Sequence, residues 1–295
     1  MQDLTKWFTS LKSRQSAREI IDDQWRTVDM DCHRERLAHH WLTGNGIEIG
    51  ALHQPVKLAD GVEIRYVDYK TRVENQARYP ELDGFEIVHT DIVDDGFILN
   101  NITDYSLDFL VANHALEHSP DPYGTLLKWK SKLRPYGMLY FALPIAEQCF
   151  DRGRLLTQLA HLVEDHRLFS TSDISRILDV TEGHLREFLR ISDANIRRQN
   201  QISHIRDDQE IEQTCSDLMS VVRASVIKSD MKYDDLITAH VINLNKVYDI
   251  HYHTFSPSSL SEFVGYFCDN ADCEIVELTK SGGGECIAIL RNQSA

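Results

Sequence analysis

The spacing of hydrophobic residues divides the chain into parts. Over residues 4 to 41, apolar residues recur three or four positions apart among charged ones, which predicts two or three amphipathic helices. Over residues 46 to 144, short β-rich runs alternate with segments long enough for a crossover. This alternation is typical of a parallel sheet covered by helices. The expected strands are 47–51, 63–67, 85–89, 107–112 and 138–143.

The chain closes with a different pattern. Two further β-rich runs, 274–279 and 286–290, flank the stretch Ser281-Gly282-Gly283-Gly284. Glycines tolerate the positive φ angles of a tight connection, so these runs predict an antiparallel hairpin. Most of the chain between residue 144 and the hairpin is helical in pattern, and Ser256 followed by Pro257 marks the start of the last helix. The predicted fold is therefore α/β and Rossmann-like, with a mostly parallel seven-stranded sheet that ends in an antiparallel hairpin.

The length sets how this pattern divides into domains. At roughly 150 residues per domain, a chain of 295 residues corresponds to two domains or to one domain with a large insertion. We expect a helical lid over 1–43 and an α/β ligand-binding domain over 44–148 and 255–295. Residues 149–254 are expected to form a helical insertion that caps the ligand site, because loops beyond the strand ends carry specificity.

Composition and charge limit the partners. Hydrophobic residues make up 42% of the chain and the net charge is −15, which is ordinary for a globular protein and disfavours nucleic acid as a partner. The six cysteines form no CxxC pair, so neither a zinc ribbon nor a disulfide framework is expected. The sequence shows no secretory signal and no membrane-spanning apolar stretch. We expect a cytoplasmic protein without membrane insertion, and the sequence leaves open whether it is a homodimer.

Polar residues follow several of the predicted strands. Asp68, Asp91 and Asn113 lie just past strand ends, while Glu48 and Gly50 belong to the first strand and its loop. Ligands of parallel α/β sheets bind outside the carboxyl ends of the strands, so we expect these residues to converge on one crevice. Gly50 lets the backbone approach a ligand closely, and Asp68 is placed to accept hydrogen bonds from ribose hydroxyls.

Together these residues resemble the class I S-adenosylmethionine-dependent methyltransferases. The resemblance covers 46–144 and 255–291, and its motifs are GIEIGALH at 46–53, LDFLVANHALEH at 107–118 and LRPYGML at 133–139. Leu52 and Gln54 depart from it, because they stand where the family has glycines. The resemblance implies S-adenosylmethionine as the cofactor. The cofactor-binding residues that it implies are Glu48, Gly50, Ala51, Asp68, Tyr69, Asp91, Ile92, Asn113 and His114.

The resemblance also implies individual roles. Glu48 accepts from the methionyl ammonium, Asp68 accepts from the ribose, Asp91 accepts from the adenine amino group, and Ile92 packs on the adenine ring. A nicotinamide dehydrogenase is the rival interpretation. It is disfavoured because only Gly50 follows the first strand, so the G-x-G-x-x-G loop that cradles a pyrophosphate is missing.

Two histidine-containing motifs resemble a subset of these methyltransferases from glycan and surface-polysaccharide pathways. Their patterns are R-x-x-T-x-x-x-H-x-x-x-D after strand five and H-x-H-x-W-x-P before the last helix. His161 and Asp165 are four residues apart and share a helix face, whereas His251 and His253 point to one side of an extended segment. The matching residues are Arg154, Thr157, His161, Asp165, His251 and His253, with Phe255 at the tryptophan position.

Two roles for these histidines compete. In the first, a histidine is the general base, oriented by Asp165, and Arg154 binds the acceptor. In the second, His161, Asp165, His251 and His253 bind a divalent metal that activates a hydroxyl. We favour the first role over a metal-dependent one. A second candidate metal cluster comprises His114, Glu117 and His118.

The expected function is methyl transfer from S-adenosylmethionine to a hydroxyl of a small molecule or saccharide, with a histidine as general base. Methylation of nitrogen or carbon in a small metabolite is the alternative, because an amine needs no strong base. A non-catalytic protein that keeps the fold for binding or as a scaffold is a further alternative. The acidic net charge disfavours an RNA substrate.

Overall fold

The computed structural model describes residues 30–226, 231–245 and 249–294, and the helices expected before residue 30 lie outside them. The chain divides into two compact units. The sheet unit comprises the described residues up to Ala115, Leu126–Leu143 and those from Leu260 onward, and the helical unit comprises Leu116–Thr125 and Pro144–Ser259. The domain boundaries expected at residues 43, 148 and 254 stay predictions.

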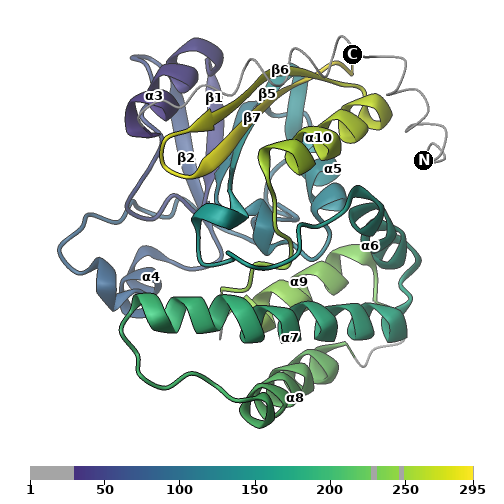
Figure 1. The fold of residues 1–295 in the computed structure, drawn as a ribbon. Helices are drawn as coiled ribbons and strands as arrows, with labels where there is room; N and C mark the ends of the chain where they lie inside the picture. Colours follow the sequence, from purple (N-terminus) through teal and green to yellow (C-terminus); the bar gives the residue numbers. More distant parts are fainter. Residues whose placement is uncertain (1–29, 227–230, 246–248, 295) are drawn as a thin grey trace. The chain divides into compact units, whose positions relative to one another are not determined.

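The sheet unit is built on one sheet with the strand order β3-β2-β1-β4-β5-β7-β6 (Figure 1). Strands β1 to β5 pair in parallel, whereas β6 and β7 pair antiparallel to each other. This arrangement confirms the predicted seven-stranded α/β sheet and its closing hairpin. The strands are β1 (Asn45–Ile49), β2 (Glu63–Asp68), β3 (Ile92–Val93), β4 (Leu107–Asn113), β5 (Leu133–Pro144), β6 (Cys273–Ser281) and β7 (Glu285–Asn292).

The strand expected over 85–89 is wrong. Residues 86–89 run without regular pairing, and the backbone N–H of Val88 donates to the carbonyl of Leu52 in the loop after β1. Pairing with β2 begins only at Val67 and Ile92, and it lasts two residues. The apolar run thus forms a loop. Phe85 is 61% exposed, whereas a strand inside the sheet would bury its apolar residues.

Helices of the sheet unit begin at recognisable capping residues. At α4, Thr71 and Glu74 form a reciprocal capping box, and α10 begins at Pro257 as predicted, with Ser256 accepting from the Ser259 N–H. Helices α5 and α10 each begin in the helical unit and continue in the sheet unit. The helices are α3 (Met30–Trp41), α4 (Arg72–Arg78), α5 (Pro122–Lys132) and α10 (Pro257–Ala271), with the 3-10 turn η1 (Pro80–Leu82) after α4.

The core of the sheet unit lies along its central strands. One buried cluster joins Leu37, Ala38 and Leu42, in and just after α3, to alternate side chains of β4, β5 and β7. The β4 residues Phe109, Leu110, Val111 and Ala112 are all inaccessible to solvent. A strand buried on both faces reads as a continuous apolar run, which is why this part of the sheet was visible in the sequence.

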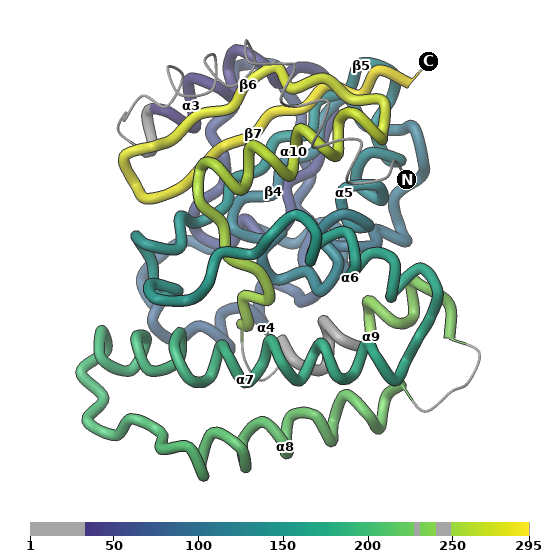
Figure 2. Tube along the Cα trace, turned by 45° about the vertical axis from the view of Figure 1, so that its right-hand side comes forward, coloured from purple at the N-terminus to yellow at the C-terminus, as the bar shows by residue number. Residues whose placement is uncertain are grey.

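The helical unit contains α6 (Leu159–Thr171), α7 (Ile174–Gln199), α8 (Asp208–Ser225) and α9 (Tyr233–Asn245), with the 3-10 turns η2 (Leu116–His118) and η3 (Ala146–Gln148). Helices α7 and α8 run side by side in both views (Figure 2). Their exposed sides are joined by ion pairs of Arg186 with Glu212 at 2.8 Å and of Arg223 with Glu182 at 2.7 Å.

The close approach of β1 to β4 makes a testable prediction. A Cβ on Gly46 would lie 2.4 Å from the Phe109 ring and 2.5 Å from its carbonyl oxygen. Gly46→Ala is therefore expected to lower the free energy of unfolding by about 1–3 kcal/mol, measured by urea denaturation. The matched control is Gly183→Ala on α7, where a Cβ meets nothing within 4 Å. That change should stabilise the protein by about 0.5–1 kcal/mol, and equal effects at the two sites would contradict this packing.

Candidate functional site

Functional side chains of the sheet unit gather at the carboxyl ends of its parallel strands. Glu48 is the penultimate residue of β1, Asp68 ends β2 and Asn113 ends β4. Because β1 pairs in parallel with both β2 and β4, these residues lie on the same edge. The Nδ2 group of Asn113 donates to Oε1 of Glu48 at 3.4 Å. The structure thus brings together two residues singled out in the sequence.

Glu48 is a buried carboxylate at the centre of this edge. It is 1% exposed, and its two oxygens accept from the Val56 N–H at 3.2 and 2.9 Å. Burial raises the pKa of Glu48 to about 7, although the Val56 N–H, the charge of Arg34 and the Asn113 amide act in the opposite direction. Beside it, the buried Oδ1 of Asn113 has no hydrogen-bond partner within the described residues. A cationic donor placed here would satisfy both acceptors.

The loop after β1 leaves room for such a group. Gly50 has a φ of 66°, and a Cβ built on it would meet nothing within 4 Å. Leu52 stands where the resemblance expects a glycine, and its φ is 48°. A left-handed backbone is costly for leucine. Leu52 therefore adopts the left-handed conformation that a glycine would adopt at this position. Replacing the family's glycine by leucine does not change the turn.

The remaining predicted cofactor residues line the neighbouring strand ends. Asp68 is half-buried, accepts from the Lys70 N–H at 3.0 Å, and has a pKa raised by burial. Asp91 is exposed, and its Oδ2 accepts from the Tyr66 N–H at 2.8 Å. The roles of Asp68 at the ribose and of Asp91 at the adenine stay predictions. So do the roles of the loop residues Ala51 and Tyr69 and of Ile92, the first residue of β3.

A buried carboxylate at the start of β7 completes this edge. Glu285 accepts two hydrogen bonds from Arg34 of α3, one of them from Nε at 2.9 Å, and a third from Ser281 at 3.1 Å. Its Oε2 lies 2.9 Å from Nε2 of His114, whose side chain is 43% exposed. Although burial opposes ionisation, the hydrogen bonds from His114 and Arg34 lower the pKa of Glu285 to about 2. Sequence reasoning missed Arg34 and Glu285, because residues 251 positions apart share no local pattern.

In the helical unit, Arg154 ties the two predicted motifs together. Its guanidinium is buried and donates to Asp151 at 3.0 Å, to Glu187 at 3.2 Å, and to the carbonyls of His251 and Tyr252 at 2.8 and 3.2 Å. All of these partners belong to the protein itself. Binding of the acceptor by Arg154 stays a prediction.

Thr157 makes a second connection between the same two segments. Its Oγ1 accepts from the N–H of Thr254 at 3.0 Å, and its own N–H donates to the Thr254 carbonyl at 3.1 Å. The motif around Arg154 therefore holds the backbone of residues 251–254 in place.

The structure places His251 and His253 in different candidate metal clusters, so the metal set of His161, Asp165, His251 and His253 is wrong. His251 binds Asp151, with Nδ1 2.5 Å from Oδ2, and lies with Glu117 and His118. His253 lies with Asp165 instead, because residues 250–254 form no regular strand and side chains need not alternate there. The expected grouping of His114 with Glu117 and His118 is also wrong, since His251 joins these two and His114 binds Glu285.

Asp165 is the centre of a second cluster, whose other members are His161, His184 and His253. His161 and Asp165 share one face of α6 as expected, and His161 Nε2 lies 3.3 Å from Asp165 Oδ2. Burial raises the pKa of Asp165 to about 7 and lowers that of His184 to about 4. Sequence reasoning missed His184, because a single histidine in the charged pattern of α7 carries no distinguishing signal.

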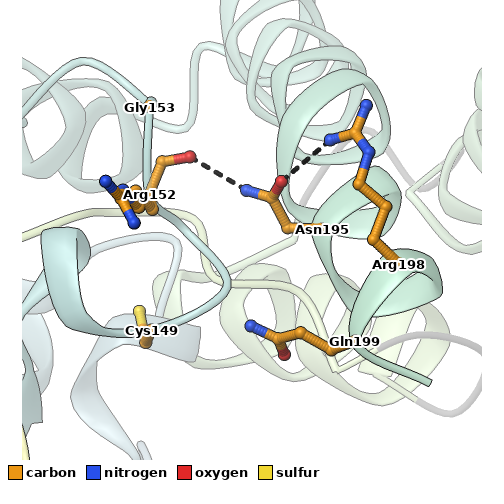
Figure 3. Close-up of a pocket in the computed structure, with 6 residues that line it drawn as sticks. All are labelled: Cys149, Arg152, Gly153, Asn195, Arg198 and Gln199. Carbon is orange, nitrogen blue, oxygen red and sulfur yellow. Dashed lines mark hydrogen bonds between the residues drawn. The ribbon is translucent and has the colours of Figure 1, made fainter. Parts of the chain in front are cut away.

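A pocket of about 460 Å³ opens in the helical unit near these segments. Figure 3 shows Asn195 between Arg152 and Arg198: its amide donates to the Arg152 carbonyl at 2.9 Å and accepts from Arg198 at 3.0 Å. Both arginine side chains belong to exposed residues. The pocket is lined by Cys149, Arg152, Gly153, Asn195, Arg198 and Gln199.

Comparisons with known proteins found only distant likenesses to solved structures, with TM-scores below 0.5. No family model and no curated protein matches the sequence. A methyltransferase dependent on S-adenosylmethionine from Aquifex aeolicus has a TM-score of 0.37 and 8% identity, over 85% of this chain and 84% of that one. The CurJ carbon methyltransferase has a TM-score of 0.37 and 9% identity over 86% of this chain, which spans half of that chain's length. A zinc-dependent alcohol dehydrogenase from Rhodobacter sphaeroides has a TM-score of 0.43 and 10% identity, over 95% and 97% of the two chains.

Scores this low are shared by proteins of different activity, so we take no activity from them. In the described part of the chain, none of the helices combines the length and apolar character needed to cross a bilayer.

The ion pair between Arg34 and Glu285 makes a prediction about stability. Arg34→Met removes the charge but keeps an unbranched side chain, and it leaves a buried carboxylate with less compensation. The free energy of unfolding should fall by about 3–5 kcal/mol. The double variant Arg34→Met/Glu285→Gln should recover part of this loss, because the uncompensated charge is gone. Additive losses in urea denaturation would contradict direct coupling of the two residues.

Proposed function

We propose that this chain is an S-adenosylmethionine-dependent methyltransferase that methylates a hydroxyl of a small molecule or saccharide. The observation that carries the proposal is the pair of acceptors at the carboxyl ends of β1 and β4. Glu48 is buried with a raised pKa, and Asn113 Oδ1 is buried without a partner in the described chain. Together they fit the ammonium of an amino-acid moiety, next to the open turn at Gly50.

The same edge supplies places for the rest of the cofactor. Asp68 would accept from the ribose hydroxyls and Asp91 from the adenine amino group, as their positions at the ends of β2 and before β3 allow. When bound, S-adenosylmethionine supplies a methyl group activated by its sulfonium. What remains for the protein is to orient the acceptor, exclude water and accept a proton.

His114 is the histidine that we assign as the general base. It follows Asn113 directly, at the strand end where the cofactor residues gather, and its side chain is 43% exposed. Glu285 Oε2 lies 2.9 Å from Nε2 of His114, and a carboxylate in this position orients an imidazole and stabilises the imidazolium that forms when it takes the hydroxyl proton. Among the histidines predicted from the sequence, the His161 side chain is also 43% exposed. Those of His251 and His253 are 7% and 0% exposed, so both are less suited to meet a substrate.

The pocket of Figure 3, within the helical unit, suits a group that carries a negative charge. Arg152 and Arg198 line it, although the chain as a whole has a net charge of −15. Guanidinium groups bind phosphate and carboxylate in a forked geometry. A sugar nucleotide or another acidic saccharide, the acceptor class that the resemblance suggests, would carry such a group.

Cofactor binding should depend on pH through Glu48. Below its pKa of about 7 the carboxyl is neutral and cannot pair with the ammonium, so affinity should rise with pH. Calorimetric titration of S-adenosylmethionine should give an affinity roughly 25-fold higher at pH 7.5 than at pH 5.5. In Glu48→Gln this dependence should vanish. Lack of any binding at about 1 mM cofactor at pH 7.5 would reject the proposed function.

Replacing the proposed base should separate chemistry from binding. His114→Gln is expected to lower turnover by about 10²–10⁴-fold at saturating cofactor, a condition needed because the resemblance also places His114 at the cofactor. Transfer of a labelled methyl group to a panel of sugar nucleotides, sugars and amines would measure it. His39→Gln, at an exposed position of α3, is the matched control and should keep full turnover. Undiminished turnover in His114→Gln would rule out this base, and labelling of amines alone would reject a hydroxyl acceptor.

A further inference from the structure

We propose that the helical unit binds a divalent metal ion of the zinc type through His161, Asp165, His184 and His253. One ligand atom from each residue lies within 4.8 Å of the others. The site differs from the metal set expected in the sequence, because His184 of α7 takes the place of His251. The inference is independent of the proposed methyl transfer, since it concerns other residues.

The distances within the cluster match a tetrahedral centre. Zinc bonds to imidazole nitrogen and carboxylate oxygen at about 2.0–2.2 Å, which places neighbouring ligand atoms about 3.3–3.5 Å apart. The Nε2 atoms of His161, His253 and His184 lie 3.3, 3.7 and 3.9 Å from Asp165 Oδ2. The Nε2 atoms of His161 and His184 are 3.0 Å apart. Small shifts would bring all four donors to one ion.

Buried groups in the cluster lack partners that a metal would supply. Asp165 is 1% exposed, and neither of its carboxyl oxygens takes part in a hydrogen bond within the described residues. The same is true of Nε2 of His253, which is fully buried. Leaving a polar group buried and unpaired is unfavourable, and more so if it is charged. A cation on Asp165 Oδ2 and the imidazole nitrogens would remove this cost.

The surrounding structure is suited to hold such a centre. The ligands come from α6, from α7 and from the 251–254 segment, whose backbone is fixed by Arg154 and Thr157. The Tyr252 carbonyl accepts a hydrogen bond from His184. An orienting acceptor of this kind is usual behind metal-bound imidazole. The charge of Arg154 is compensated by Asp151 and Glu187.

The composition of the site indicates its role. Three histidines and one carboxylate complete a four-coordinate shell, and a closed shell of this kind is typical of structural rather than catalytic zinc. The ion would cross-link α6 and α7 to the segment before α10. It would thereby contribute folding free energy to the helical unit.

Zinc binding by the untagged, chelator-treated protein tests the proposal. Calorimetry should show one Zn²⁺ per chain, and thermal unfolding should move to higher temperature as Zn²⁺ is added. His184→Ala and Asp165→Asn should each weaken zinc affinity by at least about 100-fold, because loss of an outer-shell partner alone costs about 10–100-fold. His204→Ala is the matched control. His204 belongs to the same unit, is exposed and contacts Glu210, so zinc affinity should be unchanged.

His161→Ala keeps the test decisive where a buried variant fails to fold. The His161 side chain is 43% exposed, so this variant should keep its circular dichroism spectrum while losing zinc affinity. Replacement of zinc by Co²⁺ should give the visible spectrum of a tetrahedral ion in the parent protein and not in His161→Ala. A folded parent protein that binds no zinc, or undiminished affinity in folded His161→Ala, would overturn the proposal.

Discussion

The parallel pairing of β1 with β4 is the constraint on which the cofactor site depends. It aligns Gly46 with Phe109 and Glu48 with Val111, and the two backbones come so close that only glycine fits at position 46. The pairing also brings Glu48 within reach of Asn113, in an environment where water no longer solvates the carboxylate. The register of β1 against β4 is thus what places polar side chains together at this edge.

Both units contain buried ionisable side chains, and these side chains differ in how many hydrogen-bond partners they have. Glu285 is satisfied by Arg34, His114 and Ser281, so it stays ionised far below the pKa of an ordinary glutamate. The two terminal nitrogens of Arg154 donate to two carboxylates and two carbonyls. Asp165 has no hydrogen-bond partner among the described residues, although three histidine nitrogens lie 3.3–3.9 Å from its Oδ2. Buried charge is costly unless it is paired, so a group left without a partner is where a missing ligand is most reasonably sought.

Several elements were predictable because their signals are local. The strand at 107–112 is a continuous apolar run, and the cap at Ser256 and Pro257 identifies the start of α10. The strand expected at 85–89 failed for the opposite reason. Its β-rich composition reflects side-chain preferences only. Whether a segment forms a strand depends on where its backbone hydrogen bonds go, and here the Val88 N–H donates to Leu52 in the loop after β1 rather than to β2. At Leu52 the sequence suggested a changed loop, and the backbone kept the left-handed turn all the same.

The sequence by itself determined the α/β architecture, the polar residues at the strand ends and the helix face shared by His161 and Asp165. Those features depend on periodicity and on spacings within one element. Only the tertiary structure decided that Arg34 meets Glu285, that His184 rather than His251 joins Asp165, and that His114 binds Glu285. These contacts join residues from different elements. No local pattern records them, because packing sets which side chains meet.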